Sequence, residues 1–379
     1  MKKNLLILLL SAGLLYLGSC GREKTNAEDI SMVVGTYTGN GSHGIYSLKF
    51  DQGNGTFHMV DSLAAVNPSY LIFSDDGTKI YSVNEVENEG AGVSAISFDS
   101  GTGIMSLLNG EVTGAGAPCY LTTNGKLLAT ANYGGGSMSV FPLAADGTLL
   151  PMDTLYAGGV GGPDSVRQEA PHVHCVQFSP DGHYLYASDF SADRLLVFKV
   201  SEDGTHLTPL KNTAGEEVSV AVDPDYGPRH LIFDETGKHA YVIGELSGTI
   251  TVFDYDNGNL TPTQVIDADP YDGRGSADIH LSPDGKFLYA SNRLKGDGIS
   301  IFEVDGETGL LKEKGYQLTG LHPRHFNITP NGKYLLVACR DTNEIEIYLR
   351  DPATGELSKH KDTLQIPSPV CVQFFAGNN

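Results

Sequence analysis

The stretch Val173–Val200 reads VHCVQFSPDGHYLYASDFSADRLLVFKV. It contains an apolar segment, an Asp-Gly turn, a second apolar segment, a polar segment and a third apolar segment. The clearest further copies of this unit are Pro228–Tyr255, Ser276–Val304 and Pro323–Arg350. Short runs rich in Val, Ile and Tyr between glycine turns are typical of β-strands. A unit of this kind that recurs along the chain predicts a repeat architecture.

The tight turns of the repeat number six. They are Asp76-Gly77, Asn124-Gly125, Asp181-Gly182, Thr236-Gly237, Asp284-Gly285 and Asn331-Gly332. Asn-Gly and Asp-Gly are expected to supply the positive φ angles of a hairpin turn. Aligned on these turns, the units are predicted to start at residues 68, 116, 173, 228, 276, 323 and 369.

The seventh unit, Pro369–Phe375, ends after one strand. Strands that would complete it are present at the other end of the chain, in Met32–Tyr37 and Gly44–Phe50. The sequence therefore predicts an all-β fold, a seven-bladed β-propeller whose last blade is closed by N-terminal strands. Such closure joins both chain ends in one blade and protects the edges of the ring.

Composition excludes several classes of protein. The 379 residues carry a formal charge of −21, so the chain is expected to be repelled by nucleic acid. With 40% hydrophobic and 19% charged residues, the chain does not have the composition of a disordered protein. After the N-terminal region, no apolar stretch reaches the length of roughly 18 residues that a membrane-spanning helix needs.

The N-terminus predicts export. Lys2 and Lys3 precede the apolar run Leu5–Leu10, and Leu17-Gly18-Ser19-Cys20 follows, so residues 1–19 are expected to be a signal peptide. The segment is similar to a bacterial lipoprotein cleavage box, which implies a lipid on Cys20 as the only membrane contact, at the periplasmic or cell surface. We then expect a short linker at 20–30 and the propeller at 31–379. An ordinary signal peptide and a cytoplasmic protein are the alternatives.

The other cysteines, Cys119, Cys175, Cys339 and Cys371, lie in strand-like apolar runs and are expected to be buried thiols. They form no C-x-x-C pair, so no zinc site is predicted. We expect neither a metal nor another cofactor, although the pattern leaves open a divalent ion bound by Glu85 and Glu245. The oligomeric state has no signature in the sequence.

Propeller geometry brings the start of each innermost strand and the end of the next strand to the same rim of the central channel. The starts carry one predicted ring: Ser69, Ala117, His174, Arg229, Ala277, Arg324 and Val370. The ends carry a second: Glu85, Tyr133, Phe190, Glu245, Arg293, Arg340 and, as the residue assigned to the closing blade, Tyr37. Four arginines at one mouth of an acidic protein predict a small anionic ligand. The alternative is a structural ion network in which Glu85 and Glu245 pair with the arginines.

The Gly-rich stretch Ala157–Ala170 leads into Pro171-His172-Val173-His174 and is too long for a simple turn between blades. It is predicted to lie at the same mouth, where it could cover a ligand. A disordered insertion is the alternative.

Several segments resemble the bacterial 6-phosphogluconolactonases of the propeller lactonase family, which also includes fungal carboxymuconate lactonising enzymes. They are GPxxxRQxxPHVH (Gly162–His174), GPRHLIF followed by YVIGEL (Gly227–Leu246), ADIHLSPDGKFLYASNR (Ala277–Arg293) and PRHFNITPNGKYLLVA (Pro323–Ala338). The resemblance covers nearly the whole chain after the signal. It implies hydrolysis of 6-phosphogluconolactone to 6-phosphogluconate, a step of the pentose-phosphate pathway.

The resemblance also implies an active-site set of one His, two Arg and one Glu, which falls here on His174, Arg229, Glu245 and Arg293. As further substrate-binding residues we predict Arg324, Arg340, His172, Glu85 and Tyr133. Asp278 and His280, in the matching ADIH segment, lie off the two rings and are expected to pack against or orient their neighbours.

For the mechanism, Glu245 or His174 is the candidate general base for water, and Arg229 with Arg293 would stabilise the oxyanion. Arg324 and Arg340 would hold the phosphate. No Ser-His-Asp or Cys-His nucleophile pattern is identifiable. Two other functions stay open: a non-catalytic propeller that binds a small anionic sugar or a protein, and a muconate-type cycloisomerase. Export also conflicts with a cytoplasmic phosphorylated substrate, and therefore favours an extracytoplasmic lactone if the signal is real.

Overall fold

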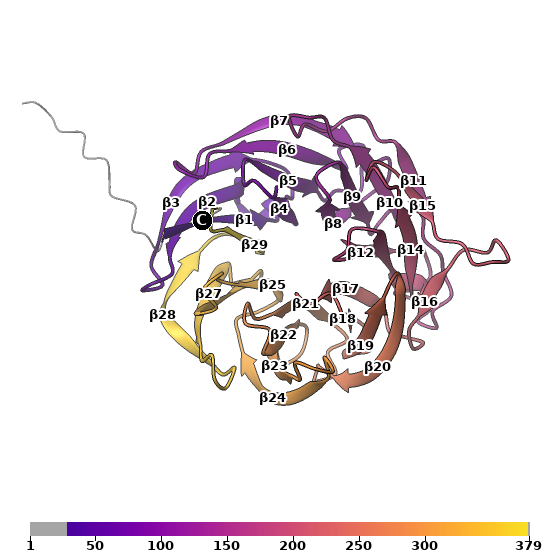
Figure 1. Ribbon diagram of the computed structural model, residues 1–379. Coiled ribbons are helices and arrows are strands. Elements are labelled where there is room, and N and C mark those ends of the chain that lie inside the picture. The colour runs from indigo at the N-terminus through magenta and orange to yellow at the C-terminus, as the bar shows by residue number, and fades with distance from the viewer. Residues whose placement is uncertain (1–28, 378–379) are drawn as a thin grey trace, which may run out of the picture.

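The computed structural model describes residues 29–377. Seven antiparallel sheets are arranged radially around one axis (Figure 1), which confirms the predicted seven-bladed β-propeller. Among the described residues, no helix has the length and apolar character needed to cross a bilayer. The predicted signal peptide and Cys20 lie outside the described residues.

The strands form four concentric layers. The innermost strands are β4 (Leu71–Phe73), β8 (Pro118–Thr123), β12 (Val173–Phe178), β17 (Pro228–Phe233), β21 (Ser276–Leu281), β25 (Pro323–Ile328) and β29 (Pro369–Phe375). The second layer contains β5 (Lys79–Asn84), β9 (Leu127–Asn132), β13 (Tyr184–Asp189), β18 (His239–Gly244), β22 (Phe287–Asn292), β26 (Tyr334–Cys339) and β1 (Asp29–Thr36).

The third layer contains β6 (Gly92–Phe98), β10 (Ser137–Pro142), β14 (Arg194–Val200), β19 (Thr249–Asp256), β23 (Gly298–Val304), β27 (Glu344–Arg350) and β2 (Gly44–Asp51). The outer layer contains β7 (Met105–Val112), β11 (Thr154–Ala157), β15 (Leu207–Pro209), β16 (Ser219–Ala221), β20 (Asn259–Asp267), β24 (Leu311–Leu318), β28 (Leu357–Gln365) and β3 (Phe57–Ala64). Two short 3₁₀ turns, η1 (Thr38–Asn40) and η2 (Phe190–Ala192), lie between strands.

Both chain ends meet in one blade, with strand order β29-β1-β2-β3. Val34 of β1 pairs with Val372 of β29 on one side and with Tyr46 of β2 on the other. The closure is therefore as predicted. Strand β1 begins at Asp29, inside the range 20–30 that the sequence assigned to a linker.

The tight turns differ from the predicted type. Positive φ occurs at the glycine alone, for example +64° at Gly77, whereas the preceding Asp76 is absent from the positive-φ residues. The Asp76 carboxylate instead accepts the backbone N–H of Thr78 at 3.0 Å, and Gly77 N donates to Ser74 O at 2.8 Å. The turn is thus held by a side-chain acceptor and one left-handed glycine, because an Asp carboxylate can close a turn without adopting positive φ itself.

The outer layer departs from the repeat in one blade. Strands β15 and β16 both pair with β14, so the outer strand of this blade is split in two by the intervening segment.

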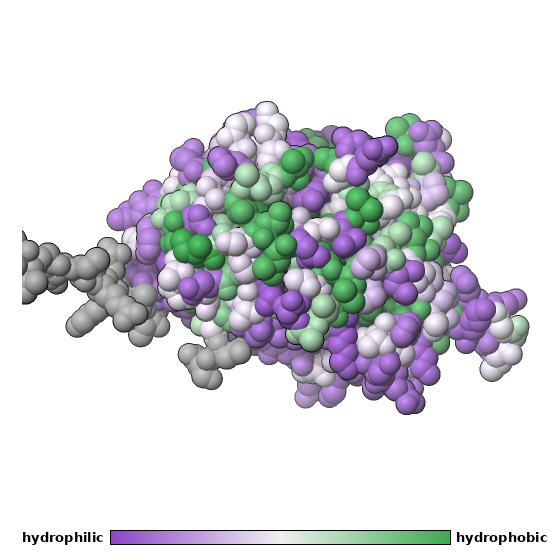
Figure 2. Space-filling view, turned by 90° about the horizontal axis from the view of Figure 1, so that it is seen from above, coloured by the Kyte–Doolittle hydropathy of each residue, from purple (hydrophilic) through white to green (hydrophobic). Residues whose placement is uncertain are grey.

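Strand β7 exposes the apolar side chains of Leu107, Leu108 and Val112. Figure 2 views the molecule from the side on which β7 lies in Figure 1, and hydrophobic residues there interrupt a hydrophilic surface.

Six of the seven innermost strands carry a register shift near their start. In β17 the shift falls between Pro228 and Leu231, and the same feature occurs in β8, β12, β21, β25 and β29. A β-bulge re-aims side chains that would otherwise alternate between the two faces of a strand. Consecutive residues such as Arg229 and His230 can therefore both contact groups on neighbouring blades around the axis.

Candidate active site

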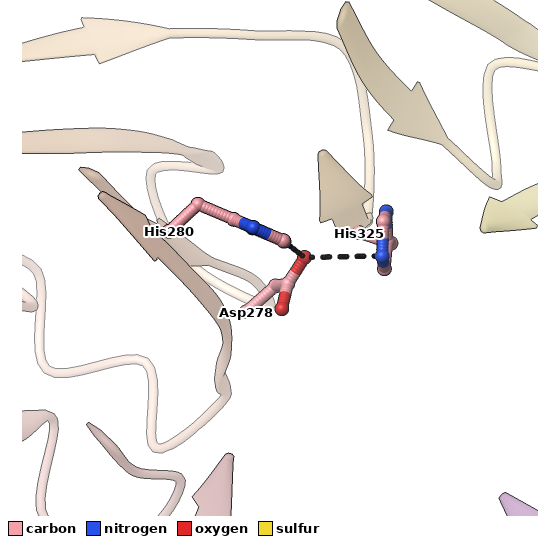
Figure 3. A group of neighbouring side chains, drawn as sticks. All are labelled: Asp278, His280 and His325. Atoms are coloured by element: carbon pink, nitrogen blue, oxygen red, sulfur yellow. Dashed lines mark hydrogen bonds and ion pairs between the residues drawn. The ribbon is translucent and has the colours of Figure 1, made fainter. Parts of the chain in front are cut away.

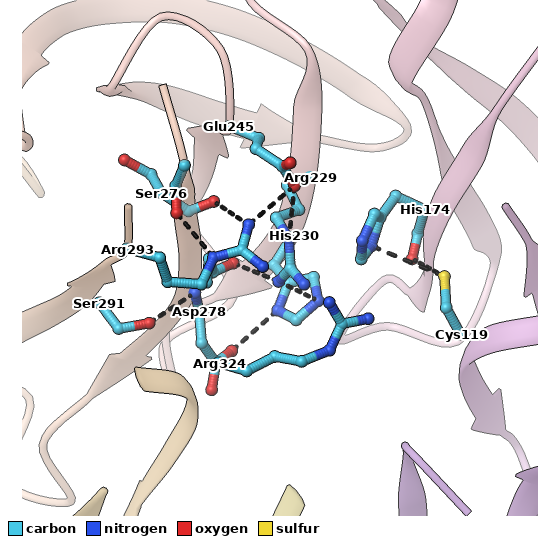
Figure 4. A network of polar contacts seen from close by, with 12 residues as sticks. Cys119, His174, Arg229, His230, Glu245, Ser276, Asp278, Ser291, Arg293 and Arg324 are labelled. Atoms are coloured by element: carbon cyan, nitrogen blue, oxygen red, sulfur yellow. Dashed lines mark hydrogen bonds and ion pairs between the residues drawn. The ribbon is translucent and has the colours of Figure 1, made fainter. Parts of the chain in front are cut away.

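Glu245 is a carboxylate at which several arginines meet, at one rim of the channel, which we call the mouth. It follows β18, and its Oε2 accepts Arg229 Nε at 2.9 Å and lies 3.2 Å from Arg293 Nη2. Arg229 comes from the start of β17 and Arg293 from the end of β22, so three strands of two blades meet at one carboxylate (Figure 4). All three residues are buried, with exposed fractions of 1% to 6%.

Glu85 holds a second carboxylate at the same mouth. Tyr37 donates its hydroxyl to both oxygens of Glu85, at 2.9 and 3.0 Å. Arg324 lies over the Tyr37 ring at 5.5 Å and brings Nη2 to 3.7 Å from Glu85. Tyr37, the residue assigned to the closing blade, therefore lies at the mouth. It contacts Glu85 from the predicted ring of strand ends and Arg324 from the predicted ring of strand starts.

The loop Ala157–Ala170 supplies a residue that the sequence analysis did not assign. Arg167 places Nη2 2.5 Å from Glu245 Oε1 and lies over the Phe190 ring at 5.5 Å. The neighbouring Gln168 anchors the loop by donating to Phe190 O and to Asp193 Oδ1. The loop therefore lies at the mouth, as predicted, and contributes Arg167 to it. Arg167 is the only arginine in this loop and lies in the GPxxxRQ segment quoted above. That motif was the sequence signal that could have identified it as a site residue.

His174 faces this group from β12. Its Nδ1 lies 3.8 Å from Cys119 Sγ, and Cys119 also donates to His174 O at 3.4 Å. Burial, followed by the charges of Arg229 and its neighbours, holds the pKa of His174 well below its usual range. The imidazole is consequently neutral at pH 7. Burial also raises the pKa of Cys119, so this thiol is not an activated nucleophile.

Tyr133 and His172 form an aromatic wall beside His174. Their rings stack at 4.1 Å with an angle of 4°, and His172 Nδ1 lies 2.7 Å from Tyr133 O. The Tyr133 ring meets His174 edge-on at 5.5 Å. The flat faces of such rings are suited to packing against an apolar face of a sugar ring.

Arg340 is the predicted residue that stands apart from this network. Its guanidinium makes two contacts with the adjacent Asp341, at 2.6 and 3.0 Å, and 32% of the side chain is exposed. Asp341 in turn lies 3.6 Å from His322, which is next to Arg293. Arg340 is therefore at the outer edge of the mouth rather than in its centre.

The charges at the mouth do not balance. Four guanidiniums, from Arg167, Arg229, Arg293 and Arg324, face two carboxylates, from Glu85 and Glu245, which leaves a net charge of 4 − 2 = +2. Burial alone would raise the pKa of Glu245, but Arg293, Arg229 and Arg167 together lower it to about 2. A cation bound by the two carboxylates would be repelled by the same arginines, so the arrangement suits an anion.

Several polar groups at the mouth have no hydrogen-bond partner within the described part of the chain. Apart from its 3.7 Å ion pair with Glu85 and its contact with the Tyr37 ring, the guanidinium of Arg324 makes no hydrogen bond, and Arg229 Nη2 makes none either. His174 Nε2 is likewise without a hydrogen bond. Buried or half-buried polar groups are normally satisfied. The free guanidinium donors can be satisfied by a bound anionic molecule.

Comparison with known proteins agrees with this picture. The family described as a seven-bladed β-propeller lactonase matches residues 31–374. A 6-phosphogluconolactonase of Formosa agariphila is 35% identical over 91% of this chain and 99% of its own.

Solved structures of similar proteins span the same length. A putative 6-phosphogluconolactonase of Bacteroides uniformis superposes with a TM-score of 0.89 at 52% identity, covering 92% of this chain and 100% of that one. A periplasmic gluconolactonase of Pseudomonas aeruginosa gives 0.85 at 32% identity, covering 91% and 99%. The chain belongs to the seven-bladed β-propeller lactonase family.

Proposed function

We propose that the protein hydrolyses 6-phosphogluconolactone to 6-phosphogluconate. The observation that carries this proposal is the net +2 charge at the mouth together with the Arg324 guanidinium, whose donors make no hydrogen bond among residues 29–377. A phosphate monoester carries nearly two negative charges at pH 7, and a guanidinium binds it in bidentate fashion. Relatives named 6-phosphogluconolactonase support the same substrate.

The reaction needs a base, an oxyanion site and a proton for the leaving group. Water attacks the lactone carbonyl while His174 Nε2 takes its proton, and the oxygen that becomes anionic is stabilised by Arg229 and Arg293. The ring C–O bond then breaks, and the proton on His174 passes to the departing alkoxide. The product is an open-chain acid with a free hydroxyl, and His174 is neutral again.

His174 is a better candidate than Glu245 for the base. A carboxylate with a pKa of about 2, held by three arginines, has little affinity for a proton at pH 7. The pKa of His174 is also lowered, by burial and then by Arg229 and other cations. A bound phosphate dianion offsets those cations, so substrate binding itself raises the pKa of His174 towards its usual range.

Replacement of Arg324 by Met tests the phosphate site. We expect KM for 6-phosphogluconolactone to rise about 10- to 100-fold, because a hydrogen bond to a charged group contributes about 1.5–3 kcal/mol. KM for unphosphorylated δ-gluconolactone should change less than about threefold, because this substrate has no phosphate to lose contact with. Steady-state rates, corrected for spontaneous hydrolysis, measure both. Arg340→Met, at the outer edge, is the matched control; equal effects of Arg324→Met on the two substrates would refute the phosphate assignment.

The pH dependence of kcat tests the base. The pKa of His174 is depressed, so catalysis is expected to be lost only as pH falls through this lowered value, and to be retained above it. With the 6-phosphate bound, the acidic limb should lie at higher pH than with δ-gluconolactone, because the dianion raises the pKa of His174. His174→Gln should lower kcat about 10²- to 10⁴-fold and abolish the limb. An unchanged limb in His174→Gln would exclude this residue as the base.

We further propose that residues 1–19 are removed and that Cys20 carries a lipid. Asp29 begins β1 and Tyr37, at the mouth, follows its end, so the chain enters the propeller at the rim opposite to the mouth. An anchor at that rim would leave the mouth facing away from the membrane. The substrate pool would then be extracytoplasmic, as for the periplasmic gluconolactonase relative.

Mass spectrometry of the protein from a membrane fraction tests the anchor. The expected N-terminal peptide starts at a diacylated Cys20, and Cys20→Ser should release the protein into the soluble fraction. A peptide that starts at Met1 would instead place the enzyme in the cytoplasm, where its substrate would be the phosphorylated lactone.

A further inference from the structure

A second layer of polar residues lies one position deeper on the axis than the mouth. His230, Asp278 and His325 directly follow Arg229, Ala277 and Arg324 in their strands, and their exposed fractions are 4%, 3% and 1%. The His230 ring meets Tyr120 at 4.9 Å and His174 at 5.4 Å, which come from other blades. The bulges of β17, β21 and β25 therefore place two successive residues on the axis.

Asp278 is the buried anion of this layer. The partners of its carboxylate are histidine rings and a backbone N–H, and no Arg or Lys side chain contacts it within the described residues. Oδ1 lies 2.8 Å from His230 Nδ1, and Oδ2 lies 3.0 Å from His280 Nε2. Phe326 N donates to Oδ2 at 3.1 Å, and His325 Nε2 lies 3.6 Å away (Figure 3). Burial would raise the pKa of Asp278, but His325, His280 and His230 hold it well below its usual range. Asp278 is therefore ionised.

The hydrogen-bond partners fix which nitrogen of His230 carries the proton. Arg229 Nη1 lies 3.0 Å from His230 Nε2, and a guanidinium can only donate, so Nε2 is the acceptor. Burial and the Arg229 charge lower the pKa of His230 to about 3, so the ring is neutral and its single proton is on Nδ1. That proton points to Asp278 Oδ1. The result is a continuous chain from Asp278 through His230 to Arg229.

The protonation of His325 is unfavourable for a metal ion between Asp278, His280 and His325. Asp278, His280 and His325 have ligand atoms within 4.8 Å of one another, which is a composition that can hold a divalent ion. However, Val372 N donates to His325 Nδ1 at 3.3 Å, so the proton of the neutral ring is on Nε2. His325 therefore presents an N–H, not a lone pair, to the space between the three residues.

We propose that His230 and Asp278 are positioning residues for Arg229. Three contacts fix the guanidinium: Glu245 at Nε, and the carbonyl of Ala277 and His230 Nε2 at Nη1. Together they leave Nη2 as the free donor that faces a ligand. Asp278 keeps His230 in the one tautomer that can accept from Arg229. The inference rests on the proposed function, in which Arg229 stabilises the oxyanion.

Two conservative replacements of His230 separate this role from a structural one. The side-chain amide of Gln reaches the place of Nε2, so His230→Gln keeps the acceptor for Arg229 and loses the donor to Asp278. His230→Asn does the reverse. We expect kcat in His230→Asn to fall about 10- to 100-fold with KM changed less than about threefold, and His230→Gln to keep kcat within about fivefold. His280 contacts Asp278 but not Arg229, so His280→Gln is the matched control and should keep wild-type kcat.

If His230 merely anchors Asp278, His230→Asn will retain activity and His230→Gln will lose it, and the proposal is overturned. Melting temperatures of all three variants identify losses that come from unfolding. Independently of any activity, ¹⁵N NMR of the histidine-labelled wild-type protein should show His230 protonated on Nδ1 at pH 7. An Nε2-protonated or doubly protonated His230 would overturn the proposal. Wild-type protein with no lactonase activity but an Nδ1-protonated His230 would refute the proposed function and retain the geometric assignment.

Discussion

The gathering of four guanidiniums around one axis is the constraint on which the rest of the site depends. Like charges this close repel, and each loses hydration on burial, so the cluster requires fixed counter-charges. Glu245 meets three of the arginines and Glu85 meets the fourth, and Asp278 adds a negative charge one layer below. Even with Asp278 included, the balance is +1. A bound anion would complete the balance, and this is the physical basis for proposing a negatively charged substrate.

The propeller is suited to this task because it brings distant residues to one line. Each blade contributes the start of its inner strand and the end of the next, so Tyr37, His174, Arg229 and Arg324 become neighbours although long segments separate them in sequence. The backbone hydrogen bonds of seven sheets hold these positions. The blade that joins β29 to β1 closes the ring and pairs the two ends of the described chain.

Much of this arrangement was predictable from the repeat. Aligning the Gly turns fixed the register of the strands, and register alone placed His174, Arg229, Glu245 and Arg293 at one rim. The same alignment missed His230 and His325 and set Asp278 aside. In a regular strand, successive side chains point to opposite faces, so the residue after a member of the predicted ring is expected to point away from the axis. The bulges break that alternation, and nothing in the strand pattern marks them. Arg167 was missed for a different reason: a loop has no register, so its residues cannot be placed by counting.

The hydrogen-bond chemistry was also beyond the sequence. Pairing of Glu245 with arginines was weighed as an alternative to ligand binding, yet the structure has both paired carboxylates and donors without partners. That coexistence distinguishes the mouth from an ion network in which every donor is paired. It also shifts the choice of base, because the arginines that hold Glu245 in place remove its affinity for a proton.

The central claim is that the mouth carries excess positive charge for an anionic sugar. Calorimetric titration of the wild-type protein with 6-phosphogluconate and with gluconate tests it directly. The account predicts at least about tenfold tighter binding of the phosphorylated acid, equivalent to about 1.4 kcal/mol, and an advantage that shrinks as salt is added. Equal affinity for the two acids, or no binding of either, would contradict it.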